Sequence, residues 1–496
     1  MKNLDKKDFK ILLFTGFAGW TEILHDFSIR LKKDYPQINF VAYCLGVHNK
    51  NFLINQNDIN YEAVYCSDEM RLGYWNKKYD KSRIDELEKK YGDPFLTKIF
   101  YTDRQLVTHS HPDFYDHDPS YEEILNIFEA TFDDIESITE DCDLAIAYAG
   151  ASSEAQVLYR VCKERGVPFL SFIHGRLGPF YNFQKTARDK YHILEDAWRE
   201  TILNNRPSSN EAKEWYKECY NNLVNKSKTS VPYVDAKNYY VDNKKLNLFN
   251  ITKSLKNLSK KRVVQNNTVR RKTQLKKNIL FKLRQQRSKK YFSTKITKSP
   301  FVLFPLHLEP EASTLVFGGE NYDALGAIKR ISYFLPARWR ILVKEHSVMR
   351  GKRPISFYKE LKNIYNVDII SPNVDSMNLM KKSEALIVNT STMGLEAGIM
   401  GLRVICLGSP FYSFIPSIYS LKSFKDIEDI LSTSWTIEQK SKCINEMRIL
   451  VESMYDISLK DNDKILWNSA PDINKKNKFV ENLYKQLFID IKKLYQ

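Results

Sequence analysis

Several features that would assign this chain to a familiar class are missing from its sequence. No run of about 18 or more apolar residues occurs, so we expect no helix that spans a membrane. The seven cysteines are scattered and include no CxxC pair, which argues against a zinc site and indicates reduced thiols. Residues 1–10 are charged and lead directly into an apolar run, which is not typical of a signal peptide. We therefore expect a cytoplasmic protein.

Motifs for cofactors and metals are also missing. Gly16 and Gly19 do not complete a GxGxxG pattern, so dinucleotide binding is poorly supported. Residues 109–118 contain three histidines among aspartates and invite a metal-site interpretation. Neither an HExxH motif nor a cysteine accompanies them, and a solvated loop is the better interpretation. We expect neither a metal ion nor a cofactor.

The positive charge of the chain is confined to one segment. The net charge is +16 over 496 residues. Residues 225–298 hold 22 Lys and Arg against Asp235 and Asp242, a balance of +20, so the remainder carries −4 (16 minus 20). Apolar residues at helical spacing predict a basic helical insertion, which is either a solvated element or a contact with the inner-membrane surface. Near an anionic leaflet each Lys or Arg contributes about 1 kcal/mol. We expect no nucleic-acid partner, because no aromatic interleaving or known binding module is present.

Strand-like apolar runs alternate with helical segments in both halves of the chain. Such alternation implies βαβ units and parallel sheets. We therefore predict an α/β protein with two Rossmann-like domains, residues 1–224 and 299–437, separated by the insertion at 225–298 and followed by a helical tail at 438–496. The predicted strands are 10–16, 39–44, 144–148 and 168–173 in the first domain, and 301–305, 340–343, 367–370, 385–388 and 403–407 in the second.

Polar motifs follow two strands of the second predicted domain. Lys344 and His346 come directly after one strand, and Ser391, Thr392 and Gly394 open a predicted helix after another. Ligands of open α/β sheets bind beyond the carboxyl ends of the strands, and the N-terminus of a helix favours an anion. A lone histidine after a strand is more often structural, but two polar clusters at strand ends are hard to explain by packing. The sequence therefore predicts a nucleotide-phosphate site.

Three further places hold candidate residues with open interpretations. Glu396 lies in the first turn of the same helix, and either interacts with the helix dipole or accepts hydrogen bonds from ribose hydroxyls. Glu309 and Glu311 flank a proline after the first strand of the second domain, and either orient a donor or acceptor or form an ordinary acidic loop. His174 and Arg176 end a strand of the first domain, and either approach a bound sugar or form a structural turn.

A set of motifs between residues 309 and 412 carries a family resemblance. They are PEAST at 310–314, VKEH at 343–346, SP at 371–372 with Ser376, TSTMGLEA at 390–397, Gly401, and VI at 404–405. In this order they resemble the capsule polysaccharide biosynthesis family, which includes Kdo-transferase-like enzymes. The resemblance covers about a fifth of the chain and is moderately specific.

The resemblance implies a GT-B fold, in which two Rossmann-like domains face a cleft and the C-terminal domain holds a nucleotide sugar. In related CMP-sugar transferases a His-Pro pair and a Ser-Ser or Ser-Thr pair contact the nucleotide phosphate. His346 and the pair Ser391-Thr392 match this pattern, whereas Ser347 stands where the family has proline. On this basis Ser313 is expected to bind substrate, and Glu311 and His346 are the expected catalytic residues.

The function expected from these observations is glycosyl transfer in capsular or surface polysaccharide biosynthesis. The donor would be a nucleotide-activated sugar, with a CMP-Kdo-like donor as one option, and the acceptor a glycan or a lipid-linked glycan. The enzyme would be cytoplasmic and peripheral to the inner membrane. Two alternatives stay open: a polyol-phosphate transferase of the teichoic-acid type, and a non-catalytic capsule-assembly protein.

Overall fold

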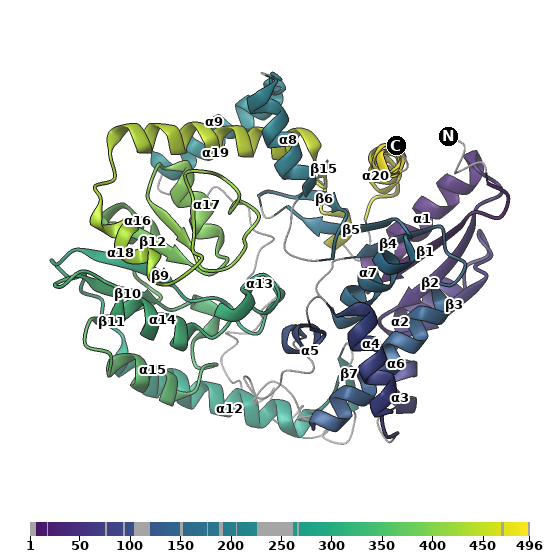
Figure 1. Cartoon of the computed structure of the whole chain (residues 1–496), viewed down its shortest axis with the longest axis horizontal. Helices are drawn as coiled ribbons and strands as arrows, with labels where there is room; N and C mark the ends of the chain where they lie inside the picture. Colours follow the sequence, from purple (N-terminus) through teal and green to yellow (C-terminus); the bar gives the residue numbers. More distant parts are fainter. Residues whose placement is uncertain are drawn as a thin grey trace.

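The first half of the chain folds around a seven-stranded sheet (Figure 1). The computed structural model describes residues 6–494, except 17, 75–76, 93–94, 104–119, 149–151, 176, 188–191, 205, 226–260, 265–266 and 468–470. The sheet order is β15-β6-β5-β4-β1-β2-β3, and β6 and β15 are antiparallel to their neighbours. Its strands are β1 (Lys10–Thr15), β2 (Asn39–Cys44), β3 (Ala63–Cys66), β4 (Leu144–Tyr148), β5 (Phe169–His174), β6 (Phe180–Gln184) and β15 (Leu459–Lys460).

Side chains of β1 are buried on both faces of this sheet. Ile11 and Leu13 lie in one hydrophobic cluster, and Leu12 and Phe14 lie in another. Because successive side chains of a strand point to opposite faces, a continuous apolar run is typical of a sheet covered on both sides. The helices of this half are α1 (Ala18–Asp34), α2 (Val47–Ile54), α3 (Ser67–Tyr74), α4 (Lys81–Tyr91), α5 (Thr97–Thr102), α6 (Tyr121–Ile138), α7 (Ser153–Arg165), α8 (His192–Leu203) and α9 (Asn210–Val224).

The second half folds around a six-stranded sheet in which all pairs are parallel. The order is β11-β10-β9-β12-β13-β14, which is the Rossmann order 3-2-1-4-5-6 counted from the first strand of this half. The strands are β9 (Phe301–Pro305), β10 (Arg340–Lys344), β11 (Val367–Ile370), β12 (Ala385–Val388), β13 (Val404–Cys406) and β14 (Tyr419–Ser420). The helices between them are α13 (Ala312–Leu315), η2 (Gly319–Asn321), α14 (Ala324–Tyr333), η3 (Ser347–Met349), α15 (Ile355–Lys362), α16 (Ser376–Lys382) and α17 (Thr392–Ile399).

The basic segment between the halves is only partly described, because residues 226–260 lie outside the described residues. Its described part holds α12 (Arg271–Ser288) and the short η1 (Lys289–Tyr291), in agreement with the predicted helical character. An antiparallel pair of strands, β7 (Lys261–Val264) and β8 (Asn267–Arg270), precedes α12 and was not expected from the helical spacing.

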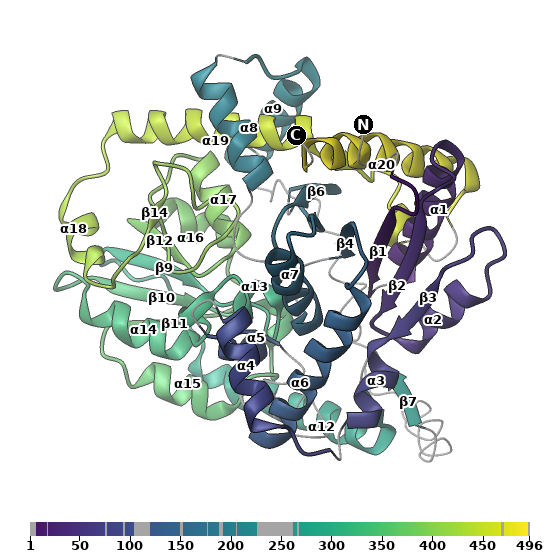
Figure 2. The ribbon, with the colours of Figure 1, turned by 45° about the vertical axis from the view of Figure 1, so that its right-hand side comes forward.

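The tail returns the chain from the second half to the first. After α18 (Asp426–Ser432), the long α19 (Ile437–Ile457) packs against α8, α9 and α17. Then β15 pairs with β6, η4 (Ile465–Trp467) follows, and α20 (Ile473–Leu494) packs against α1. Figure 2 shows α19 and α20 running along one side of the molecule, with α20 beside α1.

These contacts cross the boundaries predicted at residues 224 and 437. Trp198 of α8 and Tyr216 of α9 share a hydrophobic cluster with Leu303 of β9, whereas Leu487 of α20 lies in a cluster of the first sheet. The predicted α/β architecture is confirmed: two Rossmann-like halves and a helical C-terminal region form a GT-B-like arrangement. The domain limits stay a proposal.

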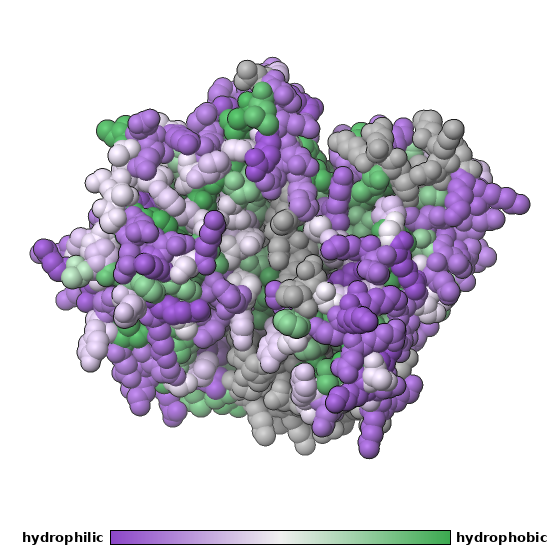
Figure 3. Space-filling view, viewed as in Figure 1, coloured by the Kyte–Doolittle hydropathy of each residue, from purple (hydrophilic) through white to green (hydrophobic). Residues whose placement is uncertain are grey.

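Hydrophilic residues dominate the surface on the side seen in Figure 3, and hydrophobic ones are scattered among them. In the described part of the chain, no helix is both long and apolar enough to cross a membrane.

The docking of α20 on the first half is testable through one buried leucine. Leu487 is fully buried against the core shared with α1, so Leu487→Ala is expected to lower the free energy of unfolding by about 2–5 kcal/mol. Ile489 on the same helix is 49% exposed, and Ile489→Ala is expected to cost less than about 0.5 kcal/mol. Chemical denaturation measures both. If both substitutions lower the free energy of unfolding by less than about 0.5 kcal/mol, the packing of α20 described above is contradicted.

Candidate functional site

Three polar residues lie at equivalent positions just beyond the carboxyl ends of β10, β9 and β12 in the second sheet. Lys344 pairs with Pro305, and the register Leu386–Leu303 places Val388 beside Pro305 as well. Two residues further on, His346, His307 and Thr390 follow β10, β9 and β12 at equivalent positions. Neighbouring strands are about 4.8 Å apart, so roughly 10 Å separate the backbones of the outer two positions. The predicted motifs therefore lie at the same sheet edge, with His307 between them.

His307 occupies the point where the strand order reverses. The chain proceeds from β9 to β10 on one side and later to β12 on the other, and ligands of open α/β sheets bind at this switch point. The backbone N–H of Thr390 donates to Nε2 of His307 at 3.4 Å, so the two strand ends are joined there. Thr390 Oγ1 donates to the carbonyl of Ser313 at 2.6 Å, which holds α13 beside the same edge.

His346 is positioned as a neutral hydrogen-bond donor. Its Nδ1 accepts from the backbone N–H of Val348 at 3.3 Å and caps η3, which leaves the proton on Nε2 in the neutral ring. Burial lowers the pKa of His346; Glu345 opposes this shift, and nearby cations such as Arg353 add to it. The imidazole is therefore neutral at pH 7 and can donate one hydrogen bond from Nε2.

The N-terminus of α17 is built by three neighbouring residues. Ser391 is the N-cap, and its Oγ accepts from the backbone N–H of Met393 at 3.2 Å. The hydroxyl of the fully buried Tyr412 donates to the carbonyl of Ser391. A Cβ on Gly394 would lie 2.1 Å from that Tyr412 hydroxyl, so this position requires glycine for packing. Ser391 and Thr392 themselves are half-buried at the start of the helix.

A buried arginine joins the loops that follow β9 and β10. Arg353 is 4% exposed; its guanidinium bonds Glu345 at 3.1 Å, the carbonyl of His307 at 2.6 Å, and Glu309. Tyr358 donates to Glu345 at 2.6 Å. Burial opposes the charged form of Arg353, but the carboxylates of Glu309 and Glu345 outweigh it, and the pKa of Arg353 is raised. This network positions the backbones of His307 and His346.

The carboxylate of Glu309 is therefore already paired, and its side chain is only 11% exposed. Glu311 accepts a hydrogen bond from the hydroxyl of Ser313 at 3.1 Å, and both are half-buried. Lys344 is buried, and its ammonium donates to the carbonyl of Pro372, beyond β11, at 3.3 Å. That carbonyl is on the side of β10 away from β12. The roles predicted for Glu309, Glu311, Ser313 and Lys344 stay predictions.

Glu396 is buried rather than exposed on the helix surface. It is 4% exposed, and burial raises its pKa to about 7. Both interpretations of Glu396, an interaction with the helix dipole and a hydrogen bond to ribose hydroxyls, stay predictions.

The first half approaches this edge through α5, which contacts α13. Both views show α5 and α13 side by side between the two halves (Figures 1 and 2). His174 ends β5 with its ring edge-on to Tyr181, 5.0 Å between ring centroids. Arg176 and the histidine-rich residues 109–118 lie outside the described residues. Among the described residues no group of His, Cys, Asp and Glu is arranged to hold a metal ion.

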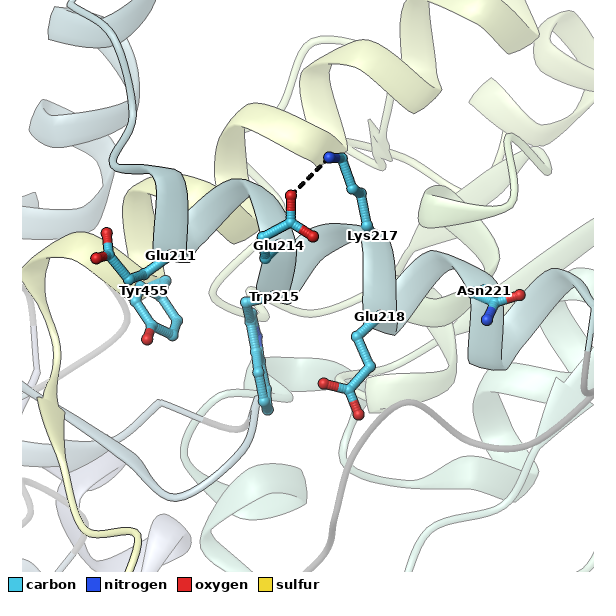
Figure 4. Close-up of a pocket in the computed structure, with 7 residues that line it drawn as sticks. All are labelled: Glu211, Glu214, Trp215, Lys217, Glu218, Asn221 and Tyr455. Atoms are coloured by element: carbon cyan, nitrogen blue, oxygen red, sulfur yellow. Dashed lines mark hydrogen bonds and ion pairs between the residues drawn. The ribbon is translucent and has the colours of Figure 1, made fainter.

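Two surface depressions lie elsewhere in the described part of the chain. One, of about 610 Å³, lies on α9 and the end of α19. Figure 4 shows Trp215 and Tyr455 there among polar side chains. Three glutamates against one lysine make it unsuited to a phosphate. The other, of about 570 Å³, lies at the amino ends of β1 and β2. The sheet edge, where the N-terminus of α17 and the neutral His346 offer hydrogen-bond donors, is the better candidate for an anionic ligand.

Comparison with known proteins gives one family match. Residues 205–416 match the profile described as capsule polysaccharide biosynthesis protein. This region is similar to the capsule polysaccharide biosynthesis family. It contains the second sheet as far as β13, the Arg353 network and the start of α17, and it ends before α19. No curated protein sequence matches the chain.

Solved structures with similarity to the chain include an epimerase and two transferases. The chain is similar to UDP-GlcNAc 2-epimerase from Neisseria meningitidis bound to UDP-GlcNAc, at 13% identity over 96% of this chain and 100% of that chain, with a TM-score of 0.27. It is also similar to Thermosulfurimonas dismutans KpsC, beta Kdo 2,4 transferase, at 12% identity over 69% and 88% of the chains, with a TM-score of 0.36. The beta Kdo 2,7 transferase of the same KpsC gives 15% identity over 62% and 80%, with a TM-score of 0.29. At these values the similarities carry no argument about the site.

Sequence reasoning missed the parts that His307 and Arg353 play. His307 stands two residues after a predicted strand, close to the three residues that separate His346 from its predicted strand, and this similar placement was a usable signal. Arg353 lies eight residues after Glu345 in a loop, and no local pattern indicates that its guanidinium turns back to the strand end.

Arg353 is expected to hold the site together. Arg353→Met leaves Glu309 and Glu345 buried without their cation, so the free energy of unfolding is expected to fall by about 3–5 kcal/mol. Arg340 pairs with Asp368 at partly exposed positions, 30% and 27%, and Arg340→Met is expected to cost less than about 1 kcal/mol. Chemical denaturation compares the two, and equal losses would refute a special role for Arg353.

The raised pKa of Glu396 predicts a pH dependence of stability. Between pH 4.5 and pH 7 the folded protein holds a proton at Glu396 that the unfolded chain has released. Stability is therefore lost as the pH rises through this window, by about 1.4 kcal/mol per pH unit at most. Glu396→Gln stays neutral and is expected to remove this contribution, whereas Glu438→Gln, at an exposed position of α19, is expected to keep it. Denaturation at both ends of the window measures the difference; parallel pH profiles for wild type and Glu396→Gln would refute it.

Proposed function

We propose that this protein is a glycosyltransferase of capsular or surface polysaccharide biosynthesis that uses a nucleotide-activated sugar. The observation that carries the proposal is the meeting of His346, His307 and the N-terminus of α17 at the switch point of a Rossmann-ordered sheet. The family match over residues 205–416 supports the polysaccharide context.

The proposed chemistry is stabilisation of a departing nucleotide phosphate. As the bond from the sugar to the phosphate breaks, negative charge develops on the phosphate oxygens. The Nε2–H of His346 and the backbone N–H groups at the start of α17 are preorganised donors, and such donors typically supply the largest share of a rate enhancement. The dipole of α17 adds to their effect.

Glu396 is proposed to accept a hydrogen bond from the nucleoside. It lies one turn into α17, buried beneath the proposed phosphate position, and burial keeps its pKa near neutrality. The acceptor, a glycan or a lipid-linked glycan, is proposed to enter from the side of the first half, where α5 meets α13. Glu311 directly precedes α13 and Ser313 lies within it, and both are proposed to orient the donor or the acceptor at that junction.

A donor screen decides the leaving group and the transferred group. CMP, UDP and their sugar and polyol-phosphate conjugates are tested first by calorimetry and then for turnover with glycan acceptors. A CMP-linked sugar such as a Kdo-like donor is the expected substrate. Transfer of a polyol phosphate would instead assign the teichoic-acid type of reaction, and failure to bind any nucleotide would favour a non-catalytic assembly protein.

His346→Ala is the most direct test of the proposed role in catalysis. Losing one preorganised donor to the developing charge is expected to lower kcat by about 100-fold or more. His48 is exposed on α2, far from the edge in sequence, and His48→Ala is expected to retain wild-type kcat. Wild-type turnover in His346→Ala, with unchanged thermal unfolding, would overturn the assignment.

A further inference from the structure

The helix α12 is rich in basic residues. It holds seven Lys and Arg residues and no Asp or Glu. In its described part, Ile279 and Leu283 are each 46% exposed, and Arg287 is exposed one turn further on. Residues four apart lie on one face of a helix, so these three side chains line a common stripe. Aliphatic and cationic groups thus share one exposed face.

The opposite face of α12 is packed against the protein. Gly351, with φ of +77°, approaches so closely that a Cβ there would lie 2.0 Å from the carbonyl oxygen of Phe281 and 2.9 Å from the amide nitrogen of Gln285. Phe281 and Gln285 project about half a helical turn away from the stripe of Ile279 and Leu283. α12 also contacts α15. The rotation of the helix is therefore set, and the aliphatic stripe faces outward.

We propose that the outward face of α12 docks the protein on an anionic lipid surface. Ile279 and Leu283 enter the boundary between head groups and acyl chains, and the side chains of Lys282 and Arg287 contact the acidic head groups. A nucleic acid fits this face less well, because single strands are bound by aromatic stacking and the exposed apolar residues here are aliphatic.

Docking through α12 would bring the loop beside the candidate site close to the membrane. Gly351 lies two residues before Arg353, in the loop that runs from His346 to the buried ion pairs, and α12 rests on that loop. A protein held at the membrane surface through α12 would therefore have its proposed donor site close to a lipid-linked acceptor. The docking itself is independent of the proposed transferase activity.

Vesicle co-sedimentation of the full chain tests the proposal. We expect binding to vesicles of phosphatidylcholine mixed with phosphatidylglycerol, weakening as salt is raised, and little binding to phosphatidylcholine alone. The double variant Ile279→Ser/Leu283→Ser is expected to reduce partitioning by about tenfold or more, because two aliphatic anchors are lost. The charge variant Lys282→Gln/Arg287→Gln is expected to weaken binding and to flatten its salt dependence.

A matched control uses exposed isoleucines elsewhere on the surface. Ile437 and Ile473 are 83% and 63% exposed on α19 and α20, and Ile437→Ser/Ile473→Ser is expected to bind vesicles like the wild type. Because all substituted side chains are at least partly exposed, thermal unfolding is expected to be unchanged. The proposal is overturned if the protein does not bind anionic vesicles, whether or not it binds a DNA or RNA oligonucleotide. It is also overturned if Ile279→Ser/Leu283→Ser and Ile437→Ser/Ile473→Ser bind vesicles equally well.

Discussion

The register of β9, β10 and β12 is the constraint on which the candidate site depends. It brings His346, His307 and Thr390 to one level although they are separated by about forty residues at each step along the chain. The strand order reverses between β9 and β12, and at this point the backbone N–H of Thr390 donates a hydrogen bond to His307. At such a point no crossover helix covers the strand ends, and backbone donors are open to a ligand. A shift of register by one residue would turn each of these side chains to the other face of its strand.

A second constraint keeps the loops beyond this edge in place. Arg353 bonds Glu345 directly after β10, and Glu309 and the His307 carbonyl directly after β9. Its charge is used entirely within the protein, so it orders the site without competing for a phosphate. The positive character that remains for a ligand comes from the helix N-terminus and from donors such as the neutral His346. The same loop supports α12, so the proposed lipid-facing surface and the proposed donor site share one structural element.

Much of the fold could be predicted because its central strands are buried on both faces. Runs such as Ile11 to Phe14 and Ala385 to Val388 are apolar throughout, and β2, β9, β11 and β12 begin and end where the sequence predicts. The strand β15 and the return of α20 to the first half were not predicted, because they depend on contacts between residues more than 250 positions apart. The antiparallel strand β6, which pairs with the adjacent β5, was not predicted either. For the same reason the sequence indicated polar residues at strand ends but not the ion pairs of Arg353. It also left Glu396 undecided, because only the folded chain shows that this carboxyl is buried.

The central claim is that the carboxyl ends of β9, β10 and β12 form the binding site for the phosphate of a nucleotide-activated donor. A crystal structure of the protein with a bound CMP-sugar or its unreactive analogue tests this most directly. The account predicts a phosphate oxygen about 2.7–3.2 Å from Nε2 of His346 or from a backbone nitrogen at the start of α17, with the nucleoside toward Glu396. A nucleotide bound at the first sheet, or in the depression on α9, with the edge beyond β9 and β12 empty, would contradict it.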